Sequence, residues 1–269
     1  MKNLTLLLTL VILIASCTKK EDALVLPPEN SMEMDFSSFT STKSAEIAEG
    51  TIINHGYAAI NIAFWNTILY VNLAVPVASF KTAFSHVPVK TGEKMWEWTY
   101  TVEGFSGAYT ARLTGEVMTD SVEWKMYVTK TGINGFDEFM WYSGKSATDR
   151  SGGYWVLNRN NEFPEKMLRI DWKYENNDVG DIQFTIVRKL NDYRVPEKNM
   201  GAYIHYGRTE DYYNAYYDIH IFNDQISDFV DVNIQWNRSV FDGQVKSPSF
   251  YKDEDWHCWD SDGYDQDCN

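Results

Sequence analysis

The feature that most constrains the fold is a series of segments in which apolar and polar side chains alternate. Trp96, Trp98 and Tyr100 occupy every second position of one such segment, with polar side chains between them. A period of two predicts a β-strand with one buried face and one face in water, which is typical of antiparallel sheets. The same alternation recurs in the segments 109–117, 122–128, 168–174, 182–186, 217–221 and 230–236.

Turn signals separate these segments, among them Asn134-Gly135 and Asp242-Gly243. Short connections place consecutive strands side by side, which predicts a β-meander. The absence of a repeat of fixed length in the sequence argues against a propeller. We therefore expect an α+β, mainly β fold, in which the antiparallel meander curls into a half-barrel or open barrel around an N-terminal helix.

That helix is predicted over residues 52–84. Seven apolar residues recur there at spacings of three and four, which places them on one helix face, and we expect this face to be buried against the strands. Pro76 predicts a break or a kink, followed by a second short helix that ends before Pro88. Interior asparagines and the lack of flanking basic clusters favour a core helix over a membrane span. The seven residues are Ile53, Tyr57, Ile60, Phe64, Ile68, Val71 and Val75.

The charge of the chain excludes one class of partner. The 269 residues include 24 basic and 38 acidic side chains, which gives a net charge of −14. A surface this negative repels phosphate backbones, so we expect no nucleic-acid partner. It also opposes docking onto anionic lipid through side chains, and any membrane attachment then depends on acyl chains.

The N-terminus has the pattern of an export signal. Lys2 precedes an apolar run over 4–14 that is too short to span a membrane, and small residues follow it. The sequence Ile14-Ala15-Ser16-Cys17 resembles the bacterial lipobox. This resemblance implies cleavage after residue 16, acylation of Cys17 and attachment to the membrane through the acyl chains. The polar stretch 17–44 has the composition of a flexible tether.

The C-terminal segment 251–269 is acidic and carries two further cysteines. Cys258 and Cys268 form an even pair in an exported chain, which predicts a disulfide, with two free thiols as the alternative. Asp260, Asp262 and Asp265 surround Gly263 in a way that resembles a calcium loop. The alternative is a solvated acidic tail without metal, peripheral to a domain over 45–250. We expect no other cofactor.

The whole arrangement resembles a lipoprotein of the Bacteroidota. The features that carry this resemblance are the lipobox, the Glu21-Asp22 pair after it, the apolar helix, the meander and the Cys-flanked tail. It implies an outer-membrane location, on the periplasmic or the cell-surface face. A sheet curled around a helix is also similar, at the level of the fold, to the half-barrel of lipoprotein carriers.

The sequence contains no glycine-flanked serine elbow and no paired-histidine zinc motif, so it indicates no catalytic residues. We therefore expect a non-catalytic envelope lipoprotein that binds an apolar ligand or a partner. The alternatives are a glycan-directed surface enzyme or glycan-binding protein, and a structural envelope component. An apolar pocket without converging acids would favour the first, whereas two close carboxylates in a cleft would favour an enzyme.

Overall fold

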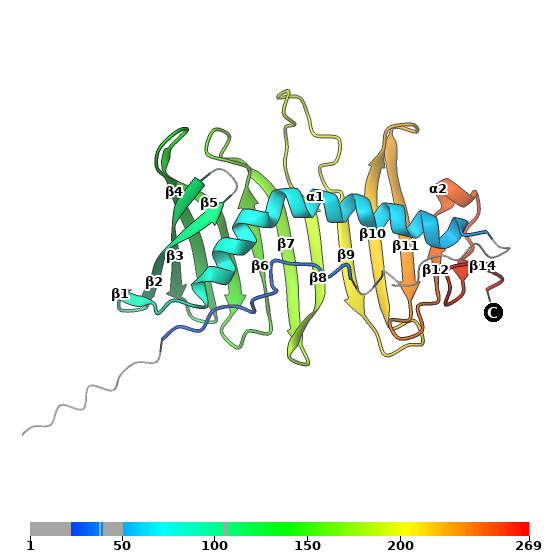
Figure 1. Cartoon of the computed structure of the whole chain (residues 1–269), viewed down its shortest axis with the longest axis horizontal. Coiled ribbons are helices and arrows are strands. Elements are labelled where there is room, and N and C mark those ends of the chain that lie inside the picture. The colour runs from blue at the N-terminus through cyan, green and yellow to red at the C-terminus, as the bar shows by residue number, and fades with distance from the viewer. Residues whose placement is uncertain (1–22, 38, 40–50, 105–106, 269) are drawn as a thin grey trace, which may run out of the picture.

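One continuous antiparallel sheet and one long helix make up most of the regular structure (Figure 1). The computed structural model describes residues 23–37, 39, 51–104 and 107–268. The helix α1 (Ile53–Ala83) crosses one face of the sheet, and the short helix α2 (Pro248–Tyr251) lies beside its N-terminal end. The strands are β1 (Val89–Gly92), β2 (Met95–Gly104), β3 (Gly107–Val117), β4 (Ser121–Lys130), β5 (Phe136–Ala147), β6 (Gly152–Asn158), β7 (Lys166–Glu175), β8 (Asp178–Ile186), β9 (Tyr203–Arg208), β10 (Ala215–Asn223), β11 (Asp228–Trp236), β12 (Gly243–Lys246), β13 (His257–Trp259) and β14 (Asp265–Gln266).

The strands follow one another in the sheet in sequence order, and each neighbouring pair is antiparallel. Within β4, Val122, Trp124, Met126 and Val128 are buried, and the residues between them are partly exposed. The alternation thus turns one apolar face toward the core and one polar face outward. The prediction of a mainly β antiparallel meander next to an N-terminal helix is confirmed.

The predicted half-barrel or open barrel is wrong, because the sheet is neither closed nor strongly curled. Its outermost strands, β1 and β14, lie at opposite ends of the molecule (Figure 1). Alternation with a period of two determines which face of a sheet is buried, but it does not determine how far the sheet curves. Two elements lie side by side on the apolar face here, so the sheet covers its core without wrapping around a single helix.

The second of these elements is the segment 23–37, which we call the strap. Its side chains of Leu26, Met32 and Met34 are buried, and Met32 has no exposed surface. They belong to the same hydrophobic core as α1 and the sheet. The expectation of a flexible tether over 17–44 is therefore wrong for the strap, because its apolar residues pack against the domain.

The strap and α1 cross the sheet in opposite directions, as the blue and cyan segments of Figure 1 show. At the start of the strap, Leu24 lies over Gly115 of β3, where an added Cβ would come within 2.6 Å of the leucine side chain. Near its end, Phe36 stacks on Tyr217 of β10 with ring centroids 5.9 Å apart. The strap therefore spans much of the sheet and leaves the remaining apolar strip to α1.

The helix α1 buries a neighbouring face and not the predicted one, and the predicted Tyr57, Ile68 and Val75 lie at its margin, half-buried. Ile53, Phe64 and Val71 are 54%, 48% and 71% exposed, whereas Trp65 and Phe80 have no exposed surface. The reason is that α1 is apolar on nearly all sides, so the spacing of its apolar residues fits more than one face. The buried residues of α1 are Asn54, Ala58, Ile62, Trp65, Leu69, Leu73, Pro76, Val77, Ser79, Phe80 and Ala83.

The second short helix predicted after Pro76 does not form. The helix α1 continues through Pro76 to Ala83, and Figure 1 shows that it bends toward its C-terminal end. Proline removes one backbone hydrogen bond and kinks a helix, but packing can hold the two halves in one element. The buried side chain of Phe80 provides this packing, with its ring 5.2 Å from that of Trp155 in β6.

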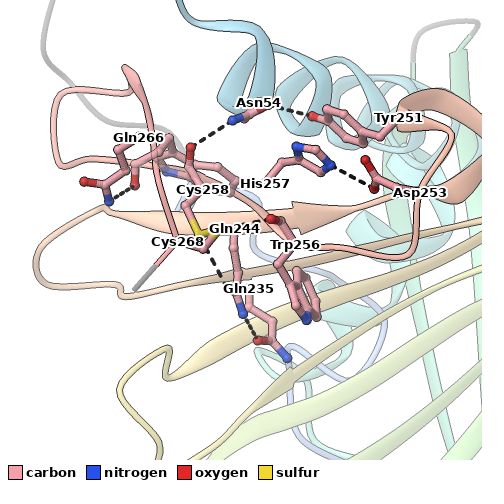
Figure 2. The surroundings of a disulfide bond; sticks show 11 residues. Asn54, Gln235, Gln244, Tyr251, Asp253, Trp256, His257, Cys258, Gln266 and Cys268 are labelled. Carbon is pink, nitrogen blue, oxygen red and sulfur yellow. Dashed lines mark hydrogen bonds and ion pairs between the residues drawn. A yellow bond between two sulfur atoms is a disulfide. The ribbon is translucent and has the colours of Figure 1, made fainter.

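The acidic tail adds β13 and β14 to the end of the sheet (Figure 2). The expectation that this tail is peripheral to the domain is therefore wrong. The side chain of Trp259 has no exposed surface, and Cys258 is 2% exposed. The predicted disulfide between Cys258 and Cys268 is confirmed, with Cα atoms 5.3 Å apart. The domain thus extends beyond the predicted limits of 45–250 at both ends.

The tail also holds the start of α1. The carboxylate of Asp265 accepts hydrogen bonds from the backbone N–H groups of Ile53 (3.2 Å) and Asn54 (2.9 Å). The Asn54 amide donates to the carbonyl of Cys258 (2.9 Å), and the Tyr251 hydroxyl donates to the Asn54 side-chain oxygen (3.0 Å) (Figure 2). An acid at the N-terminus of a helix satisfies unpaired N–H groups and complements the helix dipole. Asp265 therefore acts as a cap supplied from the other end of the chain.

Candidate functional site

An apolar groove lies between the strap and α1. Its volume is about 370 Å³, which lies at the lower end of the range for small-molecule pockets. We call it the α1 groove. It is lined by Met32, Glu33, Met34, Phe36, Asn66, Leu69, Tyr70, Leu73, Ala74, Val77, Ala78 and Lys81.

The α1 groove follows from the geometry of its two walls. Leu69, Leu73 and Val77 are spaced by four residues, so they lie in one row along α1. Opposite them, the strap contributes the two thioether side chains Met32 and Met34. Methionine side chains are flexible and polarizable, which suits a surface that must fit an apolar ligand of variable shape.

The charged residues of this lining neutralise each other. Lys81 Nζ lies 2.7 Å from the carboxylate of Glu33, and their side chains are 40% and 38% exposed. This ion pair lies where the last turn of α1 meets the strap. The groove therefore combines an apolar floor with a polar end that carries no net charge.

The outer face of α1 borders the groove and is apolar too. Ile60 and Val71 are each 71% exposed, and Tyr70 is 68% exposed. Residues 51–80 contain no Asp, Glu, Lys or Arg. The helix has a window of mean hydropathy 1.5, so by length and composition alone it could cross a membrane. Trp65 is fully buried, but only 28% of this window is buried inside the molecule, so α1 packs one face on the core and leaves another apolar face uncovered.

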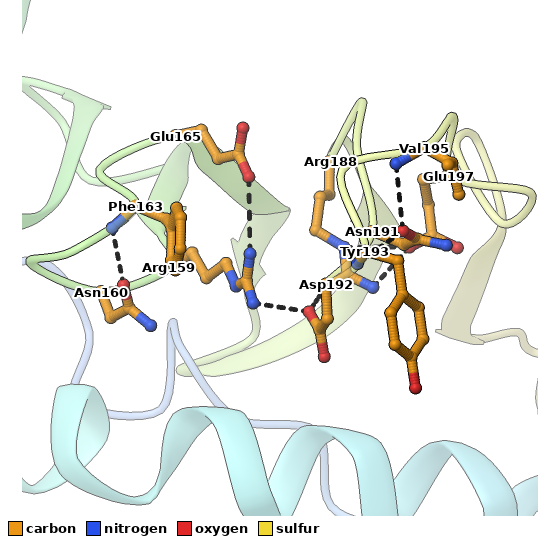
Figure 3. A network of polar contacts seen from close by, with 10 residues as sticks. All are labelled: Arg159, Asn160, Phe163, Glu165, Arg188, Asn191, Asp192, Tyr193, Val195 and Glu197. Atoms are coloured by element: carbon orange, nitrogen blue, oxygen red, sulfur yellow. Dashed lines mark hydrogen bonds and ion pairs between the residues drawn. The ribbon is translucent and has the colours of Figure 1, made fainter.

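A smaller cleft of about 240 Å³ lies on the other side of α1, beside Ile68 and Asn72. Arg188 and Glu197 line this cleft and belong to a network of ion pairs (Figure 3). Asp192 accepts from Arg159 (2.6 Å) and from Arg188 (3.0 Å), and Arg188 also pairs with Glu197. These charged side chains pair with one another. They connect the loop between β6 and β7 with the loop between β8 and β9.

A third cleft, of about 370 Å³, lies between the strap and the strands β8 and β9. Asp178 there lies 2.8 Å from Arg208 and accepts a hydrogen bond of 2.7 Å from the strap residue Asn30. Partial burial opposes ionisation of Asp178, but the hydrogen bonds from Arg208 and Asn30 outweigh it, so its pKa lies below the usual value. This carboxylate therefore fastens the strap to the sheet.

The outward face of the sheet carries a polar cleft of about 350 Å³. Its Asp181 lies 3.3 Å from both His205 and Lys173. The hydrogen bond from His205 lowers the pKa of Asp181 against the opposing effect of burial. A glycosidase needs one carboxylic acid whose pKa is raised, so that it can donate a proton. Asp181 has the opposite shift and is unsuited to that role.

The predicted metal ligands do not converge. Asp265 binds the start of α1, and the Asp260 carboxylate accepts from the backbone N–H groups of Asp262 (2.9 Å) and Tyr264 (3.0 Å). Among the residues that the structure describes, no group of three His, Cys, Asp or Glu side chains is placed to hold a metal ion. The carboxylates of Asp260 and Asp265 thus serve backbone donors in this structure. Cys17, the predicted site of lipidation, lies outside the described residues.

The α1 groove is not predicted from the sequence, because four of its twelve lining residues come from the segment expected to be a tether. A signal was present, since Met32, Met34 and Phe36 alternate with the acids Glu33 and Asp35. This alternation predicts a segment with one buried face.

Comparisons with protein-family models, with curated proteins and with solved structures found no match.

Proposed function

We propose that this chain is a non-catalytic envelope lipoprotein that binds the acyl portion of an amphiphile in the α1 groove. The observation that carries the proposal is the lining of this groove, in which aliphatic and thioether side chains form the floor and the Glu33–Lys81 pair forms a neutral polar end. Burial of an acyl chain there gains about 0.8 kcal/mol per CH₂. The balanced ion pair fits an uncharged or zwitterionic head group.

The proposal includes attachment to the outer membrane through acyl chains on Cys17. The lipobox residues Ile14-Ala15-Ser16-Cys17 support it. A protein tethered to a bilayer meets lipids at high local concentration, so a groove of modest affinity is filled there. Replacing Cys17 by alanine removes the thiol that would accept the acyl group, and it therefore separates anchoring from binding in the groove.

The lowered pKa values of Asp178 and Asp181 make these two carboxylates unsuited to be the proton donor of a glycan-directed enzyme. Both carboxylates are paired with cations, and neither is available as the proton donor that glycoside cleavage requires. A binding role needs no such donor. The apolar groove therefore supports the proposed function better than the polar clefts support catalysis.

Two matched variants, in each of which one alanine of α1 is replaced by tryptophan, test the binding proposal. Ala74 lines the groove, whereas Ala63 is exposed on the outer face and is absent from its lining. We expect Ala74→Trp to fill the groove and to weaken binding of a dansyl-labelled fatty acid at least about tenfold, which corresponds to 1.4 kcal/mol. Ala63→Trp should bind like the wild type. Fluorescence titration of variants with equal melting temperatures gives the comparison, and equal affinity of both variants would contradict the proposal.

A further inference from the structure

We infer that the outer face of α1 rests on a bilayer of zwitterionic lipid, so that the α1 groove opens toward the membrane from which it takes its acyl chain. This inference rests on the proposed anchoring through Cys17. It names the source of the ligand as a membrane lipid. Three properties of the described residues carry it: the two-sided distribution of charge, the place where the chain enters the domain, and the side chains of the exposed face.

The first property is the difference between the two sides of the molecule. Residues 51–80, which form nearly all of α1, carry no Asp, Glu, Lys or Arg side chain. The outward face of the sheet, in contrast, carries rows of ion pairs. A bilayer interior excludes the ion pairs and accepts the uncharged face of α1. The strap beside α1 carries Glu29, Glu33 and Asp35, so it stays at the level of the polar head groups while α1 meets the acyl chains. The ion pairs of the outward face include Arg112–Glu97, Arg112–Glu138, Lys145–Glu123, Arg169–Asp171 and Lys173–Asp181.

The second property is the position at which the chain enters the domain. The strap begins at residue 23 and lies in the same layer as α1, with Leu24 over Gly115 on the apolar face of the sheet. Six residue steps separate residue 23 from Cys17, which is at most about 20 Å of chain. An anchor on so short a connection keeps the start of the strap, at the β3 end of the layer that contains α1, close to the lipid.

The third property is the kind of side chain that α1 exposes. Ile60, Phe64 and Val71 are 71%, 48% and 71% exposed, and they form an apolar stripe that soluble proteins rarely leave uncovered. Tyr70, 68% exposed, has the amphipathic ring that is enriched at membrane interfaces. The net charge of −14 and the absence of basic side chains in this stripe select zwitterionic over anionic lipid.

The exposed stripe and the groove share the same helix. Tyr70 and Ala74 line the groove, and Val71 lies next to them on the outer face. If α1 lies in the interface, an acyl chain passes from the bilayer into the groove without crossing water. The acyl anchor fixes the orientation, so the stripe needs to contribute little affinity of its own.

An environment-sensitive fluorophore on the acylated full-length protein tests the orientation. The probe is attached to Ile60→Cys in one sample and to Ile133→Cys in the control, since Ile133 is 88% exposed on the turn between β4 and β5. In phosphatidylcholine vesicles, we expect the emission of the probe at position 60 to shift to the blue and to be quenched by brominated acyl chains. The probe at position 133 should keep its aqueous emission.

Each other outcome overturns the inference in a distinguishable way. Protein that floats with the vesicles while the probe at position 60 stays in water would refute the orientation but leave the anchoring and the groove intact. A blue shift without vesicles would mean that another part of this chain covers α1, or a second copy if the shift grows with protein concentration. Absence of acylation at Cys17 would overturn both this inference and the proposed anchoring, whereas binding of the dansyl fatty acid tests the groove separately.

Discussion

At the scale of single residues, the carboxylates of this chain act as fasteners. Asp178 ties the strap to β8 and β9, and Asp265 caps a helix that begins more than 200 residues earlier in the chain. The cap explains why α1 needs no capping side chain at Ile52, its own N-cap position. Sequence spacing suggested metal ligation for Asp265 because it cannot show which backbone donors lie opposite a carboxylate.

Asp178 leads to a prediction about pH. Its pKa is lower in the folded protein than in the unfolded chain, so its contribution to stability is present above the unfolded value of about 3.9 and is lost as the pH falls toward the folded value. We expect Asp178→Asn to lower the melting temperature at pH 7, and the difference from the wild type to shrink below pH of about 4. Melting curves of both proteins, recorded from pH 7 down to below about pH 4, measure this difference in melting temperature.

Arg208→Gln provides the matched control for this prediction. It removes the cation that lies 2.8 Å from Asp178, so the pH dependence attributable to Asp178 should become smaller in this background. A difference between wild type and Asp178→Asn that is equal at both ends of the pH range would show that Asp178 does not fasten the strap through its charge.

At the scale of elements, α1 determines both the core and the proposed binding surface. Our sequence prediction found the helix and its approximate limits but assigned the wrong face to the core. The pattern could not distinguish the two faces, because α1 is apolar nearly all round. Trp65 faces the sheet and has no exposed surface, while the adjacent Phe64 is 48% exposed. Tertiary packing, and not the periodicity of the sequence, determines which face of α1 is buried.

These two adjacent aromatic residues give a direct test of the orientation of α1. We expect Trp65→Ala to lower the free energy of unfolding by about 3–5 kcal/mol, as large-to-small changes in a core do. Phe64→Ala should lower it by less than about 1 kcal/mol, since much of its ring is already exposed. Chemical denaturation of the two variants measures the difference. A larger loss of unfolding free energy in Phe64→Ala than in Trp65→Ala would instead support burial of the face that the apolar spacing predicts.

At the scale of the whole molecule, the sequence predicts the class of fold more reliably than its shape. The alternation in segments such as 122–128 predicts the antiparallel strands, and the short turns predict their order. Curvature could not be predicted, because it depends on what covers the apolar face. The prolines and polar residues of the strap predict a tether, so an element that packs on the apolar face is missing from the predicted fold.

Because the strap is missing from the predicted fold, the sequence indicates the kind of site but not the residues that form it. An apolar pocket without converging acids was one of the alternatives expected, but its residues were not. Leu69, Leu73 and Val77 are outside the helix face that the apolar spacing assigns to the core, and they line a groove only because Met32 and Met34 lie opposite. The alternation of Met32, Met34 and Phe36 with acids indicates that the strap has a buried face, but it does not indicate which part of α1 lies opposite.

The central claim is that the α1 groove holds a lipid acyl chain, and native mass spectrometry of the protein extracted from its host membrane tests it most directly. We expect the wild type and Ala63→Trp to carry a non-covalent lipid in addition to the acyl groups proposed on Cys17, and Ala74→Trp to lose the non-covalent lipid. Its absence from the wild type, or its retention by Ala74→Trp, would contradict the claim.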